Sequence, residues 1–389
     1  QDMAVQALDM AQGRGGDQAA EMTPDGFTFY GGVSHGVEKR SKVRSRIVAD
    51  QLVKLIKEAD HVVIMGHRMS DLDAIGSAEG VLRICKICDV PAVIAVRRDA
   101  TLAGSLINAL IAAGQEDDFI DPKGALPIIS QRTLCIVVDT YQLGLVESRE
   151  ILEKCGKVAV IDHHRKGVGF IEKADLVCHE PYASSASELV TEFLQYVGDR
   201  DDKPNRIEAE GLLSGIMLDT RDFTLHTGVR TFEAAAALRR YGAETEHVRQ
   251  LFDVSMVEYT TKARLVSEAQ MYRGCAITVS GEVAPEARVA IAQAANDLLT
   301  IQNVEASFVA VQVGGGVNIS ARSLGAVNVQ VIMEALGGGG HQTMAAAQLK
   351  HITPEAARSR IQTAIDQYRE AQKKSGPESE PEQKKKDKQ

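Results

Sequence analysis

Acidic and histidine side chains recur in this 389-residue sequence at the points where apolar runs end. Apolar runs at 62–65, 135–138 and 158–161 each lead directly into such a group, and another acid closes the helical pattern 209–218. Because ligands of an open α/β sheet gather at the carboxyl ends of its strands, we expect these side chains to converge in one crevice. The candidate residues are His67, Asp71, Asp73, Asp139, Asp162, His163, His164 and Asp219.

Carboxylates and imidazoles together indicate a divalent metal such as manganese, whereas thiolates would indicate structural zinc. Two metals about 3.5 to 4 Å apart can hold both the attacking and the leaving oxygen of a displacement at phosphorus. One carboxylate must then bridge the two ions, and we choose Asp139. Asp71 and Asp73 are two residues apart, so a turning backbone can direct one to each metal. The pattern therefore predicts a two-metal hydrolase.

A simpler interpretation of the same residues is structural. A lone His-x3-Asp-x-Asp pattern is weak, because most such acids face solvent or cap a helix, and Asp73 is the candidate cap. The repetition of acids at three strand ends, together with the group 162–164, favours the metal site.

The segments around these residues resemble the four motifs of the DHH phosphoesterases, which include RecJ-type nucleases, family II pyrophosphatases and nano-RNA phosphatases. The resemblance implies an α/β fold with a mostly parallel sheet, followed by a smaller α/β domain that captures substrate. The matching motifs are Gly66-His67-x3-Asp71-x-Asp73, Val138-Asp139-Thr140, Asp162-His163-His164 and Leu218-Asp219-Thr220.

Carried over residue by residue, the resemblance implies a site with two Mn²⁺ ions. Its first ion would be held by His67, Asp71 and Asp139. Its second ion would be held by four residues, Asp73, Asp139, His163 and Asp219. Asp162 would orient His163, and His164 would face the substrate phosphate. The catalytic set implied in this way is Asp139, Asp162, His163 and His164.

A second resemblance lies near the C-terminus, in the stretches 318–323, 328–330 and 337–341. They are similar to the DHH-associated C-terminal domain that captures a nucleotide. Successive glycines allow a backbone to approach an anion closely, and Arg322 and His341 can add donors. The alternative is a helix C-cap after Leu336, for which one glycine suffices. The substrate-binding residues implied here, besides His164, are Asn318, Ser320, Arg322, Gly338, Gly339, Gly340 and His341.

The first forty residues resemble the end of the degenerate GGDEF domain of GdpP-type cyclic-di-AMP phosphodiesterases. Gly15-Gly16-Asp17 would not be the signature loop of a cyclase, so we assign it no catalysis. Members of this family carry two N-terminal membrane helices and a sensory domain. The resemblance therefore implies a soluble C-terminal fragment of a bacterial membrane protein that faces the cytoplasm, and it makes a homodimer plausible.

Periodicity and composition divide the chain into successive regions. We expect alternating strands and helices between the linker helix and residue 242, and a second such region after 270. The tail contains no large apolar residue and is expected to be disordered. The expected regions are 1–40, a GGDEF remnant; 41–60, a linker helix; 61–242, the DHH domain; 243–270, a helical connection; 271–372, the substrate-binding domain; and 373–389, the tail.

Composition excludes several classes of protein. The net charge of −9 argues against long nucleic acid as the main partner, because such binders carry basic stripes. No apolar run approaches the ~20 residues of a membrane span, and the acidic start is unlike a signal peptide. The six cysteines are expected to be reduced core residues, with Cys85-x2-Cys88 lacking the partner pair of a zinc site.

The most specific hypothesis is a manganese-dependent phosphodiesterase that opens cyclic-di-AMP to the linear dinucleotide 5′-pApA. Two alternatives remain. The same motifs could serve a phosphatase of short oligoribonucleotides such as pApA, or the chain could be a cyclic-dinucleotide sensor with structural metals. The sequence leaves the preference between adenine and guanine open.

Overall fold

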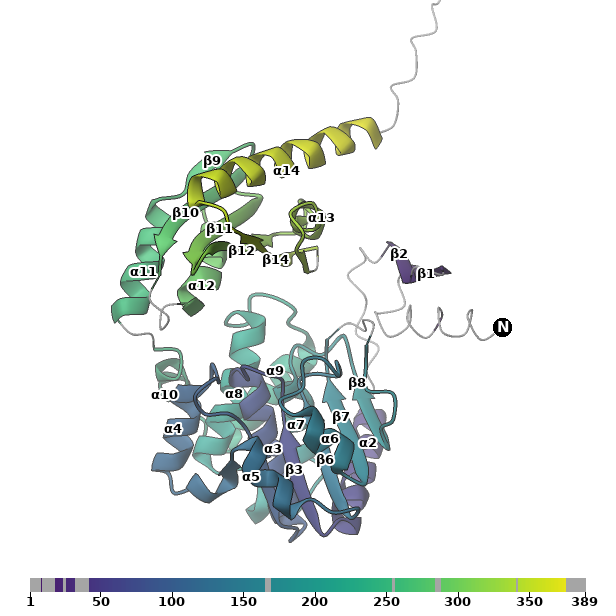
Figure 1. The fold of residues 1–389 in the computed structure, drawn as a ribbon. Helices are drawn as coiled ribbons and strands as arrows, with labels where there is room; N and C mark the ends of the chain where they lie inside the picture. The colour runs from purple at the N-terminus through teal and green to yellow at the C-terminus, as the bar shows by residue number, and fades with distance from the viewer. Residues whose placement is uncertain are drawn as a thin grey trace, which may run out of the picture. The chain divides into compact units, whose positions relative to one another are not determined.

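The chain forms two compact units in a computed structural model, residues 1–253 and 254–389, and each unit is described by itself (Figure 1). The structure describes residues 8, 18–23, 26–31, 42–164, 169–253, 256–283, 288–340 and 342–375. The division at Asp253 falls within the connection expected at 243–270.

A six-stranded parallel sheet forms the centre of the first unit, in the order β5-β4-β3-β6-β7-β8. Its strands are β3 (His61–Met65), β4 (Ala92–Ala95), β5 (Phe119–Ile120), β6 (Thr133–Val138), β7 (Lys157–Asp162) and β8 (Leu176–His179). The helices are α2 (Lys42–Glu58), α3 (Leu72–Ile87), α4 (Gly104–Ala112), α5 (Pro122–Ala125), α6 (Arg149–Lys154), α7 (Ala186–Leu194), α8 (Arg206–Thr220), α9 (Val229–Arg240) and α10 (Thr245–Gln250). Short 3₁₀ turns lie at Glu116–Asp118, Leu126–Ile128 and Arg200–Asp202.

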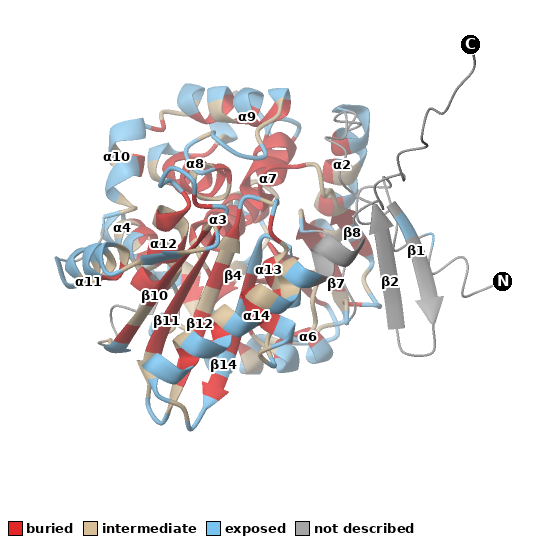
Figure 2. Ribbon diagram, turned by 90° about the horizontal axis from the view of Figure 1, so that it is seen from above, coloured by how far each residue is buried: buried red, intermediate tan, exposed pale blue. Residues whose placement is uncertain are grey.

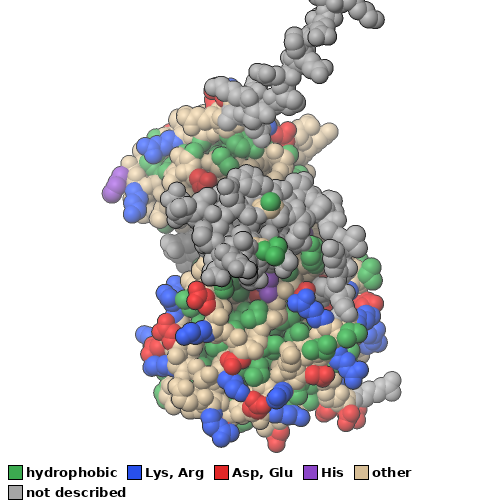
Figure 3. Space-filling model, turned by 90° about the vertical axis from the view of Figure 1, so that its right-hand side faces the viewer, with side chains coloured by type: hydrophobic (Ala, Val, Ile, Leu, Met, Phe, Trp, Pro, Cys, Tyr) green, Lys and Arg blue, Asp and Glu red, His purple; other side chains and the backbone are tan. Residues whose placement is uncertain are grey.

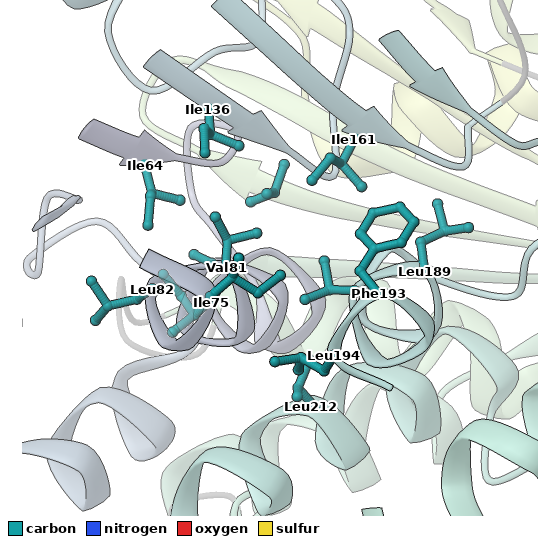
Figure 4. Packing of buried hydrophobic residues seen from close by; sticks show 14 of the residues in the cluster. Ile64, Ile75, Val81, Leu82, Ile136, Ile161, Leu189, Phe193, Leu194 and Leu212 are labelled. Atoms are coloured by element: carbon teal, nitrogen blue, oxygen red, sulfur yellow. The ribbon is translucent and has the colours of Figure 1, made fainter. Parts of the chain in front are cut away.

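Strands of this sheet are apolar along their whole length because both faces are covered, as is usual for parallel sheets. On β3, Val62 and Ile64 pack against one layer of helices, whereas Val63 and Met65 pack against the other. Figure 4 shows part of the first layer, which contains α2, α3, α7 and α8. Its labelled side chains are Ile64, Ile75, Val81, Leu82, Ile136, Ile161, Leu189, Phe193, Leu194 and Leu212. The α/β class and the parallel sheet predicted from the sequence are confirmed.

The second unit contains a mixed six-stranded sheet in the order β13-β14-β12-β11-β10-β9. Its strands are β9 (Gln270–Tyr272), β10 (Cys275–Glu282), β11 (Ala306–Val313), β12 (Gly316–Ser323), β13 (Gly339–Gly340) and β14 (Met344–Lys350). Its helices are α11 (Met256–Ser267), α12 (Arg288–Leu298), α13 (Val329–Glu334) and α14 (Pro354–Ser375). One apolar cluster joins α13 and α14 to one face of the sheet, and a second cluster joins α11 and α12 to the other.

Residues 1–41 are described only in part. Strands β1 (Gln18–Thr23) and β2 (Gly26–Gly31) pair as an antiparallel hairpin. Gly15-Gly16-Asp17, to which we assign no catalysis, lies outside the described residues, as does the tail beyond Ser375. No helix in the described part of the chain combines the length and the apolar character that a membrane crossing needs.

Candidate functional site

The loop between β3 and α3 and the first turn of α3 supply the first three predicted residues. Asp71 is the N-cap of α3, and its carboxylate accepts hydrogen bonds from the backbone amides of Asp73 (3.0 Å) and Ala74 (3.1 Å). Asp73 follows in the first turn, and its side chain is 0% exposed. The sequence-based alternative that Asp73 is the cap is therefore wrong. The capping carboxylate is Asp71, which also lies 3.8 Å from His67 Nε2.

Asp139 occupies the centre of the site, immediately after β6. Its side chain is 3% exposed, and His67 Nε2 and His163 Nε2 each lie 3.4 Å from one of its two oxygens. The backbone of Asp139 has a φ of 56°, a left-handed conformation that an aspartate adopts at some cost. This turn of the chain directs the carboxylate between the two histidines. The geometry is therefore that of a residue shared between two groups of ligands.

The end of β7 supplies Asp162, His163 and His164. His163 Nε2 lies 3.0 Å from Asp219 and 3.8 Å from Asp73. Asp162 accepts a hydrogen bond from Nδ1 of His164 (2.8 Å), whereas the family resemblance had assigned it to orient His163. The structure corrects this pairing. Strand β7 ends at Asp162, and both histidine rings turn towards Asp139, because His163 Nε2 lies 3.4 Å and His164 Nδ1 3.6 Å from its Oδ1.

Helix α7 approaches the site end-on, which the sequence did not reveal. Ser185 caps the helix, with its Oγ accepting a hydrogen bond from the amide of Glu188 (3.0 Å). The next two amides, of Ala186 and Ser187, donate to the two carboxylate oxygens of Asp73 (2.7 and 2.8 Å). The positive end of the helix thus stabilises a buried carboxylate rather than a phosphate.

Burial and mutual charge set the protonation of the cluster. Burial lowers the pKa of His67, but contacts with Asp139 and Asp71 outweigh this and raise it to about 11. Burial, and then the charges of Asp139 and Asp219, raise the pKa of Asp73. Burial opposes ionisation of Asp139 as well, yet its contacts with His163 and His67 hold its pKa well below the usual range. The acids therefore require positive charge close to them.

Three overlapping groups of donor atoms meet at Asp139, and within each group the atoms lie within 4.8 Å of one another. One group is Asp139, His163 and His164. The other two, which we call the two clusters, match the predicted ligand sets: His67, Asp71 and Asp139, and Asp73, Asp139, His163 and Asp219. In the described part of the chain, Asp139 Oδ1 and His163 Nε2 are buried without a hydrogen-bond partner. Oxygen and nitrogen donors in this state fit divalent cations, so these clusters could bind metals.

His179 is a residue near the site that sequence reasoning missed. It ends β8 and lies beside Asp162 in the register of the sheet. Its Nε2 hydrogen-bonds to the backbone carbonyl of His164 (2.5 Å), and its ring meets the ring of Tyr141 edge-on, with 5.4 Å between centroids. The sequence signal was present, because His179 also stands where an apolar strand ends.

The predicted substrate-binding residues lie in the second unit. Asn318, Ser320 and Arg322 occupy alternate positions of β12 and share one half-buried face. Arg322 donates to Ser320 Oγ (3.1 Å) and to the carbonyl of Ala321 (2.9 Å). His341 lies outside the described residues.

The glycine run next to that face has structural reasons of its own. Gly337, with φ of 78°, closes α13, and the amide of Gly338 donates to Met333 O (2.8 Å). A Cβ at Gly338 would lie 2.1 Å from Ala346 O, and one at Gly340 2.4 Å from Ala345 Cα. Close approach to β14 therefore accounts for two of these glycines. A Cβ at Gly339 would meet nothing within 4 Å, so among the predicted glycines 338–340 this position has open space beside it.

Two known protein domains match the sequence of this chain. Residues 61–216 match the DHH family, N-terminal domain, and residues 283–372 match the DHHA1 domain. The chain therefore contains a DHH domain and a DHHA1 domain. The two clusters around Asp139 thus lie in, or directly after, the DHH domain, and the β12 face lies in the DHHA1 domain.

Two bacterial proteins are similar in sequence to this chain. The sequence is 46% identical over 95% of this chain to the cyclic-di-AMP phosphodiesterase GdpP of Geobacillus thermodenitrificans, and 42% identical over 94% to the cyclic-di-AMP phosphodiesterase PdeA of Listeria monocytogenes. The chain spans 57% of the length of each relative. A crystal structure of an exopolyphosphatase-related protein from Bacteroides fragilis has the same fold, with a TM-score of 0.71 and 21% identity over 84% of this chain and 98% of that chain.

Proposed function

We propose that this chain is the catalytic part of a phosphodiesterase that uses two Mn²⁺ ions to hydrolyse cyclic-di-AMP to 5′-pApA. The observation that carries the proposal is the sharing of Asp139 between two clusters of donor atoms. Such a pair of clusters is what in-line displacement at phosphorus requires. The names of the two relatives supply the substrate class.

Six residues would hold the two ions. His67, Asp71 and Asp139 would hold one ion, and Asp73, Asp139, His163 and Asp219 the other, as the two clusters suggest. When bound, two divalent cations supply positive charge to the phosphate oxygens and acidify water for attack. The amides of Ala186 and Ser187 fix Asp73 in place for this purpose.

His164 is the side chain best placed to meet the substrate. It is 54% exposed, and its Nδ1 lies 2.8 Å from Asp162 and 3.6 Å from Asp139. With Nδ1 facing Asp162, the opposite nitrogen is directed away from that carboxylate and can contact a phosphate oxygen. Burial lowers the pKa of His164, but the contact with Asp162 outweighs this and raises it. A protonated His164 would bind the phosphate as a cation.

The DHHA1 domain would capture the nucleotide through Asn318, Ser320, Arg322 and the glycine run. Positive and negative side chains are interspersed on the visible described surface in Figure 3, in keeping with a small ligand rather than a long nucleic acid. Attachment to a membrane through parts of a longer protein, facing the cytoplasm, and assembly as a homodimer are expectations from the family resemblance.

Product analysis tests the proposal. Purified protein is freed of metal with a chelator, supplied with Mn²⁺ or left without it, and incubated separately with cyclic-di-AMP, cyclic-di-GMP and pApA. Metal-dependent accumulation of pApA from cyclic-di-AMP supports the proposal. Intact cyclic-di-AMP together with breakdown of pApA to AMP would move the chain to the oligoribonucleotide phosphatases. Tight binding of cyclic-di-AMP without any product would identify a sensor.

A further inference from the structure

One face of the DHHA1 sheet is covered over only part of its width by the described helices. Helices α11 and α12 pack on Val309 and Val311 of β11 and on Ala276 of β10. Figure 2 shows β10 and β11 buried along most of their length, whereas buried and exposed residues alternate on β14. The exposed positions of β14 therefore belong to a part of the sheet that these helices leave open to solvent.

The open part has a definite composition, which follows from the strand register. Asn318 pairs with Gln348, Ser320 with Ala346, and Arg322 with Met344. Directly opposed residues of an antiparallel pair share a face, with Cβ atoms about 5 Å apart. The face thus presents two amide side chains at one end, a cation and a thioether at the other, and two small side chains between them. The two ends are about 13 Å apart along β12.

Asn318 is the residue of this face whose side chain has an unsatisfied hydrogen-bond acceptor among the described residues. In the described structure its Oδ1 is buried and has no hydrogen-bond partner. A buried acceptor without a donor is costly, so such groups are usually satisfied by protein, water or a bound molecule. Gln348, across the strand pair, is exposed and brings both a donor and an acceptor to the same place.

We propose that Asn318 and Gln348 bind a nucleobase and give the site its preference for adenine over guanine. The inference rests on the dinucleotide substrate proposed above. An amide side chain matches the N6 and N7 edge of adenine, which offers one donor and one acceptor. The corresponding edge of guanine offers two acceptors, O6 and N7, which would leave Asn318 Oδ1 without a donor. Arg322, at the other end of the face, is placed for a phosphate.

The test compares two variants with a matched control. Gln348→Leu and Asn318→Asp each remove a hydrogen-bond donor from the face. The control, Gln362→Leu, is the same Gln-to-Leu change on α14, which packs on the opposite face of the sheet. The full chain is titrated by calorimetry with pApA and pGpG, which requires no turnover, and kcat and KM are measured with both cyclic dinucleotides. Circular dichroism confirms folding of each variant.

We expect pApA to bind the unaltered protein and the control more tightly than pGpG does. Gln348→Leu, because its position is exposed, should keep its fold and weaken pApA binding by about 5- to 150-fold, the discrimination that one bidentate contact provides. KM for cyclic-di-AMP should rise with kcat little changed, and pGpG binding should be unaffected. Equal preference for adenine in Gln348→Leu, Asn318→Asp and the control would overturn the inference. Absence of turnover with intact adenine-selective binding would instead overturn the proposed function alone.

Discussion

Gly215 of α8 lies directly against Asp73 of α3. A Cβ at position 215 would come within 2.6 Å of Asp73 Oδ1 and 2.3 Å of Ser187 Oγ. The same carboxylate accepts hydrogen bonds from two backbone amides of α7. Three helices therefore meet around one buried acid, and the smallest side chain is what allows them to do so.

Substituting Gly215 by alanine should displace Asp73 and so weaken metal binding. We expect kcat to fall by about 10- to 100-fold, the usual cost of disturbing the shell around a metal ligand. Metal content, measured after dialysis against low Mn²⁺, should fall with it. Gly104→Ala is the matched control, since Gly104 is also helical and a Cβ there meets nothing within 4 Å. Full activity in Gly215→Ala would show that the contact is not needed.

Asp139 is the residue whose loss should affect both metal positions at once. We predict that Asp139→Asn, which can keep the left-handed backbone, lowers kcat by more than about 100-fold and lowers the bound metal from two ions per chain. Asp89→Asn is the control, because Asp89 has a similar φ (56°) and is exposed, away from the cluster. Elemental analysis and turnover assays measure the two effects. Two bound ions in Asp139→Asn would contradict a bridging role.

Asp162 should act through His164 rather than through the metals. In the unaltered protein, His164 Nδ1 lies 2.8 Å from the Asp162 carboxylate. Asparagine at position 162 keeps the shape of the side chain but loses the negative charge that attracts Nδ1. We expect Asp162→Asn to retain the metal content of the unaltered protein and to lose activity by about 10- to 100-fold. The contact with Asp162 raises the pKa of His164. As the pH is increased, the rate of Asp162→Asn should therefore begin to fall at a lower pH than the rate of the unaltered protein does. Loss of metal as severe as in Asp139→Asn would make Asp162 itself a ligand.

The sequence predicts the fold and the clustering of the acids and histidines, because both depend on local patterns. Apolar runs such as 135–138 and 158–161 form buried parallel strands, and the acids that follow them meet at one edge. The roles of neighbouring residues are harder to predict. Asp71 and Asp73 have similar local contexts, and only the backbone shows that Asp71 caps α3.

Contacts between distant segments are beyond sequence patterns of this kind. Ala186 and Asp73 are 113 positions apart, and nothing local to either predicts their hydrogen bond. The fit of Gly215 against Asp73 depends on how α3 and α8 cross, which is a property of the packed structure. The pairing of Asp162 with His164 rather than with His163 also depends on the bend of the chain after β7, where both rings turn towards Asp139.

Glu79, buried in α3 away from the metal clusters, should make stability depend on pH. Burial and the charge of Glu208, itself paired with Arg83 Nε at 2.8 Å, raise the pKa of Glu79 to about 8. Gln115 Nε2 donates to Glu79 Oε1 (3.1 Å), while Glu79 Oε2 and Gln115 Oε1 are buried without partners among the described residues. A protonated or amide side chain at position 79 would supply the missing donor.

The sign of the effect follows from linkage. Between pH 4.5 and about 8 the folded protein holds a proton on Glu79 that the unfolded chain releases. The contribution of Glu79 to the free energy of unfolding therefore decreases as pH rises through that window. At about 1.4 kcal/mol per pKa unit, the decrease reaches up to a few kcal/mol. Glu79→Gln should remove this part of the pH dependence and be the more stable protein at pH 8. Urea unfolding of both proteins at pH 5.5 and 8 measures the difference, with exposed Glu153→Gln as control. Parallel pH profiles for the unaltered protein and Glu79→Gln would show that Glu79 is ionised in the folded state.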